Sequence, residues 1–131
     1  MKSCIWVPLA AVVTIHDRQI SRHGGAPGMR DPALLEMGCA RAMSLAAYKD
    51  AAELAVIAAA YAFGIAKAHA FVDGNKRAGF VTALTFLRLN GFQFRPDPVT
   101  GVRRMEDLAS SDVSEGGFAL WLTAGMQPVE A

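Results

Sequence analysis

The sequence predicts an all-α protein. Two long and almost wholly apolar segments, residues 54–65 and 78–87, have the composition of buried helices. Residues that begin or end helices recur along the chain, among them Asp31-Pro32 and Gly91. Runs that alternate apolar and polar residues, which are typical of strands, are nearly absent. The expected architecture is a compact helical bundle around the two apolar segments.

The first part of the chain is expected to form two helices joined by a loop. Pro8 suits the start of a helix that runs to about Ile20, because proline is tolerated in a first helical turn. Three glycines and a proline over residues 22–30 predict a loop or a short hairpin. Asp31 then acts as a cap before a first-turn proline, and it opens a helix through about Ala46.

Two longer helices form the centre of the expected fold. Asp50 and Glu53 have the spacing of a capping box, with aspartate in place of the usual serine or threonine, so a helix is expected from there to about Ala68. The next helix is expected over about residues 75–90, with Gly91 as its stop. The polar segment between these helices is then expected to be the loop that connects a central helix pair.

The rest of the chain is expected to add small elements to this pair. Residues 92–95 predict a brief strand, and helices are expected near residues 99–109 and 114–124. No repeat, low-complexity stretch or domain linker interrupts the sequence. A chain of 131 residues is large enough to bury roughly two thirds of its unfolded surface, so residues 1–131 are expected to form a single domain.

Composition narrows the class of protein. A formal net charge of +1 argues against binding nucleic acid through electrostatics alone. Cys4 and Cys39 give neither metal-site spacing nor a disulfide framework, so a reduced, cytoplasmic compartment is expected. Residues 1–13 contain an apolar run, but Pro8 interrupts it and no clear cleavage site follows, so a short extended lead-in is expected rather than a signal peptide. No membrane partner is expected, because no uninterrupted apolar run has the length of a span.

A dense polar cluster separates the two apolar segments. Residues 69–77 are His-Ala-Phe-Val-Asp-Gly-Asn-Lys-Arg, and they hold an imidazole, a carboxylate, a carboxamide, an ammonium and a guanidinium. Polar side chains between core helices cost desolvation free energy unless they pair with one another or bind a ligand. The cluster is therefore the first candidate for a functional site.

The order of residues in this cluster suits an anion. Gly74 permits a turn that begins the following helix near Asn75, and the first N–H groups of that helix lack intrahelical acceptors. A phosphate there is stabilised by these donors, by the helix dipole and by the charges of Lys76 and Arg77. The imidazole of His69 is the kind of group that could take a proton from a hydroxyl nucleophile. The residues alone predict a phosphate site with a base beside it.

The remaining residues of the cluster have both functional and structural interpretations. Asp73 could supply an oxygen ligand to a magnesium ion that bridges phosphates, or it could pair with Lys76 or Arg77. The magnesium role is favoured, with the ion pair as the resting state. Phe71 is expected to anchor the loop in the core, and Asn75 to cap the helix and orient its neighbours.

These residues resemble the signature of the Fic/Doc family, His-x-Phe-x-(Asp/Glu)-Gly-Asn-(Gly/Lys)-(Arg/Lys), and are closest to its Doc branch. The residues that match the Doc form are His69, Phe71, Asp73, Asn75, Lys76 and Arg77. Residues 15–31 are similar to the first helix and loop of Doc proteins, and residues 86–91 to the end of the helix after the motif. The resemblance implies a Fic-like helical bundle.

The resemblance also implies an activity, that of the toxin of a toxin–antitoxin module. With ATP and Mg²⁺, His69 would take the proton of a Thr or Ser hydroxyl as it attacks the γ-phosphate, and Asp73 would help to position the metal. The nucleotide phosphates would be bound by Gly74, Asn75, Lys76 and Arg77. The implied target is elongation factor Tu, with a block of translation, and the implied partner is a Phd-like antitoxin that folds on binding.

Two departures from the wider family bear on the reaction. Most Fic proteins that transfer adenylyl groups have glycine in place of Lys76 and a second arginine in place of Phe80. In the Doc branch these differences accompany transfer of the γ-phosphate, whereas Gly74 is closer to the adenylyl-transferring branch. Phosphotransfer is favoured; adenylyl transfer and a degenerate, non-catalytic binding protein remain alternatives.

Three further segments are weaker candidates. The loop over residues 21–30 could dock a target by strand-like pairing, as the flap of related Fic proteins does. His16 is expected to pack rather than to act in catalysis, and His23 to be solvated in the loop. Residues 111–116 fit an inhibitory motif of Fic proteins, but they straddle a loop and a helix start, so self-inhibition through Glu115 is not expected.

Overall fold

The computed structural model describes residues 4–45 and 50–129, and these residues form helices joined by short loops, with one small sheet. The helices are α1 (Leu9–His23), α2 (Pro32–Met43), α3 (Ala51–Ala68), α4 (Asn75–Leu89), α5 (Pro98–Ala109) and α6 (Glu115–Gly125), and the strands are β1 (Phe92–Gln93) and β2 (Gln127–Pro128). The all-α prediction is confirmed. A single domain over residues 1–131 stays a prediction.

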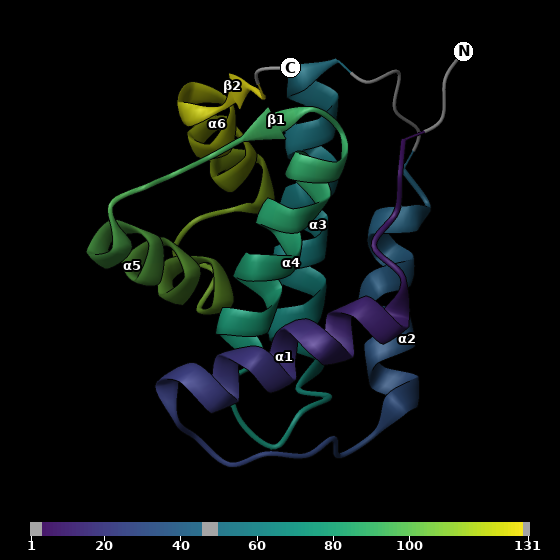
Figure 1. Ribbon diagram of the computed structural model, residues 1–131. Coiled ribbons are helices and arrows are strands. Elements are labelled where there is room, and N and C mark those ends of the chain that lie inside the picture. Colours follow the sequence, from purple (N-terminus) through teal and green to yellow (C-terminus); the bar gives the residue numbers. More distant parts are fainter. Residues whose placement is uncertain (1–3, 46–49, 130–131) are drawn as a thin grey trace.

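The long helices α3 and α4 run side by side at the centre of the molecule (Figure 1). Helix α2 packs along α3 on one side, and α5 and α6 lie on the other side. Helix α1 crosses α4 near the turn that joins α3 to α4, and it thereby lies beside the polar stretch. The expected bundle around a central helix pair is confirmed.

Most helices begin at the caps that the sequence suggested. Asp31 accepts a hydrogen bond from the backbone N–H of Ala33, and Asp50 accepts one from that of Ala52. These bonds satisfy donors that have no partner within the helix. Helix α1 continues past Ile20, so His23 is its last residue and does not lie in the loop. Helix α2 ends at Met43, and the end expected at Ala46 lies outside the described residues.

Small residues allow α2 and α3 to approach one another closely. A Cβ on Gly38 would lie 2.6 Å from the carbonyl oxygen of Gly64, and a Cβ on Gly64 would overlap the carbonyl oxygen of Gly38. The backbones therefore touch at this crossing, which no larger residue would permit. The alanine-rich α3 is largely buried among its neighbours, and its fully buried side chains include Tyr61 and Ile65.

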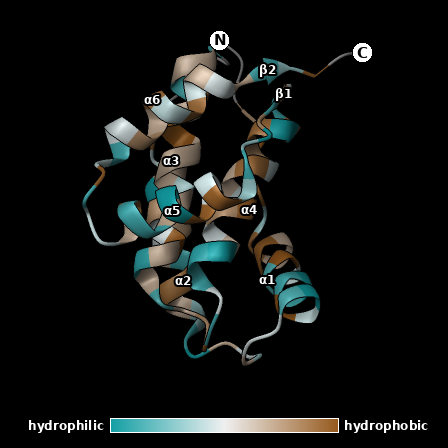
Figure 2. Ribbon diagram, turned by 90° about the vertical axis from the view of Figure 1, so that its left-hand side faces the viewer, coloured by the Kyte–Doolittle hydropathy of each residue, from teal (hydrophilic) through white to brown (hydrophobic). Residues whose placement is uncertain are grey.

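Helix α3 is long and apolar enough, by length and composition alone, to cross a membrane, although Glu53 and Lys67 interrupt its apolar run. In this fold most of its residues are buried by other helices. Figure 2 shows apolar residues along both α3 and α4, as expected of core helices.

The ends of the described chain are tied to the far end of the bundle. The side-chain amide of Asn90 accepts from the N–H of Ile5 (2.8 Å) and donates to its carbonyl (2.9 Å). The Tyr61 hydroxyl accepts from the N–H of Val7 at 3.1 Å. Strand β1 pairs in antiparallel fashion with β2, so a strand forms where one was expected, although it is shorter than residues 92–95.

Candidate active site

The polar stretch of residues 69–77 forms the turn between α3 and α4. His69 follows the last residue of α3 with a left-handed backbone (φ 51°, ψ 41°). Gly74 is also left-handed (φ 76°, ψ 19°) and directly precedes Asn75, the first residue of α4. Glycine adopts this conformation without a steric penalty. The expected turn at Gly74 and the helix start at Asn75 are confirmed.

The N-terminal end of α4 is suited to an anion. Gly74, which precedes the helix, has no side chain with which to cap it. Lys76 and Arg77 lie in the first turn, and both are exposed. The first backbone N–H groups of a helix carry partial positive charge, to which these cationic side chains add. A phosphate group fits this combination of donors.

Asn75 holds the turn and does not cap the helix. Its Oδ1 accepts from the N–H of Phe71, and its Nδ2 donates to the carbonyl of Phe71, each at 3.0 Å. Both ends of the amide are thus used on one backbone position four residues earlier. The capping role expected for Asn75 is wrong because the backbone of Gly74 occupies the cap position. Its expected role in orienting its neighbours agrees with these bonds.

Asp73 presents an ionised carboxylate at the surface of the turn. Its Oδ1 accepts from the N–H of Gly74 (2.8 Å), and its Oδ2 accepts from the N–H of Ala26 (3.2 Å). These two hydrogen bonds, with a smaller contribution from the nearby charge of Arg77, lower the pKa of the Asp73 carboxyl below its ordinary value. Among the described residues, no ion pair joins Asp73 to Lys76 or Arg77, so the expected resting pair is wrong.

The loop after α1 pairs with the motif turn. The N–H of Arg30 donates to the carbonyl of Ala70 at 2.7 Å, and the N–H of Val72 donates to the carbonyl of Gly28 at 3.0 Å. Met29 and Phe71 thereby form an isolated antiparallel bridge. The loop therefore pairs in strand-like fashion within the chain, on the side that faces the motif. Docking of a target on the loop stays a prediction.

His69 is exposed at the end of α3, where a base could reach an external hydroxyl. Its carbonyl oxygen accepts a hydrogen bond from Nη1 of Arg30 at 3.1 Å. This bond brings a third cationic side chain to the turn, after those of Lys76 and Arg77, from the loop after α1. The sequence offered no local signal for Arg30, since the two residues lie 39 positions apart.

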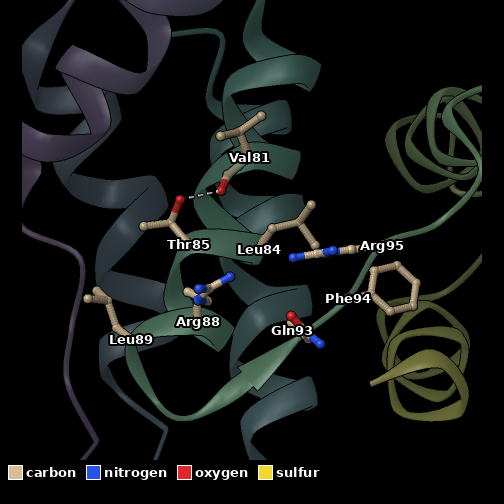
Figure 3. A pocket seen from close by; sticks show the side chains of 8 residues that line it. All are labelled: Val81, Leu84, Thr85, Arg88, Leu89, Gln93, Phe94 and Arg95. Atoms are coloured by element: carbon tan, nitrogen blue, oxygen red, sulfur yellow. Dashed lines mark hydrogen bonds between the residues drawn. The ribbon is translucent and has the colours of Figure 1, made fainter. Parts of the chain in front are cut away.

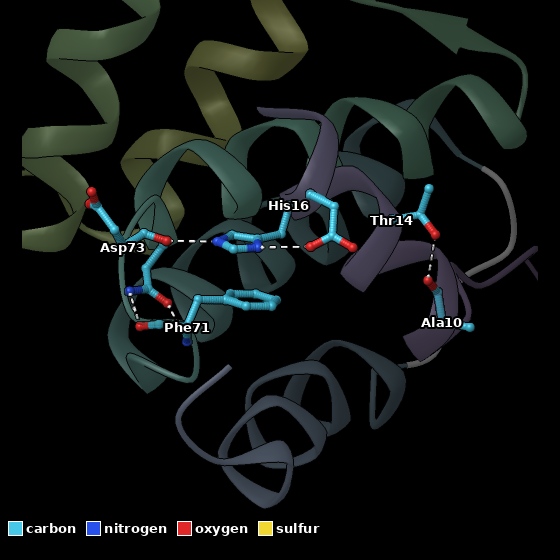
Figure 4. A network of polar contacts seen from close by, with 7 residues as sticks. Ala10, Thr14, His16, Phe71 and Asp73 are labelled. Atoms are coloured by element: carbon cyan, nitrogen blue, oxygen red, sulfur yellow. Dashed lines mark hydrogen bonds and ion pairs between the residues drawn. The ribbon is translucent and has the colours of Figure 1, made fainter. Parts of the chain in front are cut away.

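Phe71 anchors the turn, as expected, and a histidine lies against it (Figure 4). The Phe71 side chain is 1% exposed, and its ring stacks on that of His16 with centroids 3.8 Å apart. Nε2 of His16 lies 2.7 Å from the carbonyl oxygen of Asp73. His16 packs in the core, as the sequence suggested, but its hydrogen bond to the motif was not foreseen.

A metal ion at this turn would need ligands in addition to the protein side chains. In the part of the chain that the structure describes, no group of three or more His, Cys, Asp or Glu side chains could hold a metal ion by itself. Asp73 can offer one carboxylate, so a magnesium ion there would need phosphate or water oxygens to complete its shell. Burial raises the pKa of the Cys39 thiol to about 11. The thiol therefore stays protonated near neutral pH and does not offer a thiolate ligand to a metal.

Two surface features lie apart from the motif. A hollow of about 280 Å³ lies between the later turns of α4 and residues 93–95, with Arg88 and Arg95 among its lining residues (Figure 3). It contains no residue of the motif. Glu115, at the start of α6, forms an ion pair with Arg41 of α2. The glutamate of the suspected inhibitory motif therefore has a cationic partner other than Arg77.

Comparison with known proteins identifies the family of this chain. The model of the Fic/DOC family matches residues 6–87. This chain belongs to the Fic/Doc family. It is 40% identical over 87 residues to a protein named "Protein kinase doc" from Escherichia phage P1, a match that covers 66% of this chain and 69% of that protein. It is 42% identical over 86 residues to "Toxin Doc" of Mycolicibacterium smegmatis, with 65% of each covered.

The Fic/Doc match contains every element that builds the turn. Residues 6–87 include α1, the loop after it, α2, α3 and most of α4, whereas α5 and α6 lie beyond the match. The Fic/Doc part of this chain thus holds both the motif and the segments of α1 and the loop that contact it. The motif and the residues that contact it therefore lie within the same matched segment.

Proposed function

We propose that this chain is a Doc-type toxin, a protein kinase that transfers the γ-phosphate of ATP to a Thr or Ser hydroxyl of a protein target. The observation that carries the proposal is the exposed His69 on one side of a turn whose other side is a helix start with Lys76 and Arg77. The names of the two relatives, a kinase and a toxin, support it.

In this reaction the base and the anion site have separate roles. His69 takes the proton of the target hydroxyl. Lys76, Arg77 and the backbone N–H groups from Gly74 onward stabilise the negative charge that develops on the transferring phosphoryl and its leaving group. Asn75 contributes by holding the turn that aims these donors, because its side chain is already engaged with the backbone.

Asp73 fits a role toward magnesium. Its carboxylate is exposed and ionised, and Mg²⁺ prefers oxygen ligands of this kind. When bound, the metal would neutralise phosphate charge. Asp73 would also help to hold the target hydroxyl near His69, so its loss is expected to affect both metal dependence and transfer.

The surroundings of Phe80 favour phosphoryl over adenylyl transfer. The Phe80 ring lies 6.2 Å from that of Trp121 on α6, and a Cβ on Gly101 of α5 would lie 3.2 Å from it. Position 80 therefore packs α4 against α5 and α6, where many adenylyl-transferring relatives have a phosphate-binding arginine. Adenylyl transfer is the second candidate, because Gly74 is the residue typical of that branch.

The proposal extends to partners and setting. The target would be elongation factor Tu in the cytoplasm, and its modification would block translation. A Phd-like antitoxin, disordered until bound, would neutralise the toxin by covering apolar surface near the turn. Val72, which is 51% exposed within the motif, offers such surface.

Labelled nucleotide separates the candidates. The purified protein is incubated with purified elongation factor Tu and with ATP labelled at either the γ- or the α-phosphate, and His69→Ala serves as the inactive control. Label that reaches the target only from γ-labelled ATP supports phosphotransfer. Label that reaches the target from α-labelled ATP supports adenylyl transfer. No label from either, together with no ATP binding by calorimetry, would instead support a non-catalytic binding protein.

A further inference from the structure

We propose that His16, which lies outside the motif, is a positioning residue for the reaction. It fixes the backbone of the turn that carries Asp73 and begins α4. Its effect on catalysis rests on the proposed function, whereas its effect on the turn can be measured without nucleotide or target.

His16 contacts two residues of the turn, Phe71 and Asp73 (Figure 4), and lies close to a third, Gly74. Its Nε2 lies 2.7 Å from the carbonyl oxygen of Asp73. Its ring stacks on Phe71, with centroids 3.8 Å apart and planes 5° from parallel. A Cβ on Gly74 would lie 3.6 Å from both Nε2 and Cδ2 of the same ring. The His16 side chain therefore contacts the Asp73 backbone and the Phe71 ring, and it shares the space beside Gly74 with Ile20, whose Cδ1 would lie 3.1 Å from the same Cβ.

The hydrogen bond to Asp73 has a defined direction. A carbonyl oxygen accepts and cannot donate, so Nε2 of His16 must carry the proton of this bond. The His16 side chain is 1% exposed, which limits replacement of its N–H by water. Removal of this donor therefore leaves the Asp73 carbonyl without its protein partner.

His16 holds a part of the turn that the other contacts do not hold. Residues 70–72 are held by Asn75 and by the pairing with residues 28–31. The carboxylate of Asp73 accepts two backbone N–H groups, but any cation that it binds competes with them. The bond from His16 uses the carbonyl and leaves the carboxylate available. His16 can thus keep Asp73 in place while its carboxylate binds a ligand.

Two substitutions separate the hydrogen bond from the ring contact. His16→Phe keeps an aromatic ring against Phe71 but has no N–H. His16→Gln places an amide N–H near the position of Nε2 but removes the ring. Val12→Ala is the matched control, because Val12 is fully buried on the same helix and belongs to neither the turn nor the site.

The kinetic readout is transfer of γ-labelled phosphate to elongation factor Tu. His16→Phe is expected to lower kcat about 100-fold, because small misplacements of catalytic groups have effects of this size. The KM for ATP is expected to stay within about twofold, since the anion-binding groups are unchanged. His16→Gln should recover most of the lost kcat. Val12→Ala should lower the melting temperature while leaving kcat and KM as they are.

The second readout is backbone amide hydrogen exchange of the free protein. His16→Phe is expected to speed exchange over residues 71–75 about tenfold relative to the amides of α3, because a local opening becomes easier. Val12→Ala should leave that ratio unchanged. Should His16→Phe not fold, His16→Met takes its place in both readouts, since methionine fills the volume and lacks the donor.

The two readouts together decide whether His16 positions the turn. Slower transfer by His16→Phe together with faster exchange at the turn, and rescue of both by His16→Gln, supports the inference. Unchanged exchange or unchanged kcat in His16→Phe overturns it, and so does a His16→Gln variant as impaired as His16→Phe. If the unsubstituted protein transfers no phosphate, the proposed function fails, and the exchange ratio alone then decides whether His16 holds the turn.

Discussion

The motif turn and the α2–α3 crossing are held together in opposite ways. At the crossing, Gly38 and Gly64 bring two helix backbones into direct contact. At the turn, residues 70–75 are held by hydrogen bonds from α1, from the loop after α1 and from Asn75. The crossing depends on the absence of side chains, whereas the turn depends on particular donors and acceptors.

This difference predicts that stability and activity separate along the chain. Changes at the crossing should unfold the protein without altering the chemistry of what remains folded. Changes at the exposed end of the turn should remove the chemistry and leave the fold intact, because the side chains of His69 and Lys76 contribute little to the core. Substitutions in each region test this separation.

The largest effect is expected at His69. His69→Ala should lower transfer on the order of 1000-fold, since general-base catalysis contributes effects of this size, with the melting temperature almost unchanged. His69→Asn is the matched variant, because asparagine tolerates the left-handed backbone that His69 adopts (φ 51°). Both are measured by γ-phosphate transfer and by thermal unfolding. Full activity in either variant would show that His69 is not the base.

The reverse effect is expected at the crossing. Gly64→Ala should lower the free energy of unfolding by about 3 kcal/mol or more, because its Cβ would overlap the Gly38 carbonyl and two helices would have to move apart. Gly116→Ala is the control, since its Cβ would lie 3.9 Å from the nearest atom, the Oγ of Ser114. Denaturant unfolding compares the two. An unfolding curve for Gly64→Ala that matches the unsubstituted protein would show that the close backbone contact does not require glycine at position 64.

Local structure and long-range contacts differed in how far the sequence could predict them. The helices were accessible because their signals are local: Asp31 and Asp50 cap helices, and long apolar segments fill them. The turn at Gly74 was accessible for the same reason, since its backbone conformation is a property of one residue. Local signals sufficed wherever a single residue type determines the backbone.

Contacts between distant segments were not accessible. His16 and Asp73 are 57 positions apart, and nothing in the helix around His16 distinguishes a packed histidine from one that bonds to a motif. Asp73 bonds to the N–H of Ala26, and not to its charged neighbours, because the loop after α1 lies against the turn. Such partners are set by how helices pack, which sequence spacing does not encode.

A smaller effect is expected from protonation of Asp73. Its pKa is lowered by hydrogen bonds from the N–H groups of Gly74 and Ala26, so the ionised form is favoured in the folded state. The resulting stability is present above the ordinary aspartate value of 3.8 and is lost as the pH falls through the lower folded value.

The variant Asp73→Asn tests this link between pH and stability, because asparagine has no carboxyl group to ionise. The difference in unfolding free energy between the unsubstituted protein and Asp73→Asn should shrink as the pH falls from about 6 to about 3. Denaturant unfolding at several pH values measures it. A difference that stays constant over this range would mean that the two hydrogen bonds do not favour the carboxylate.

The smallest effect is expected at the ion pair between Glu115 and Arg41. The side chains are 25% and 54% exposed, and pairs of this kind contribute about 0–1 kcal/mol, so Glu115→Gln should change stability little. Arg41→Gln should cost more, because the Arg41 guanidinium also lies 5.4 Å from the ring centre of Phe63. Neither variant should alter transfer, since neither residue belongs to the turn. A large rise in phosphate transfer by Glu115→Gln would show instead that this glutamate inhibits the site. Helix α6 would then contribute to the control of activity as well as to the fold.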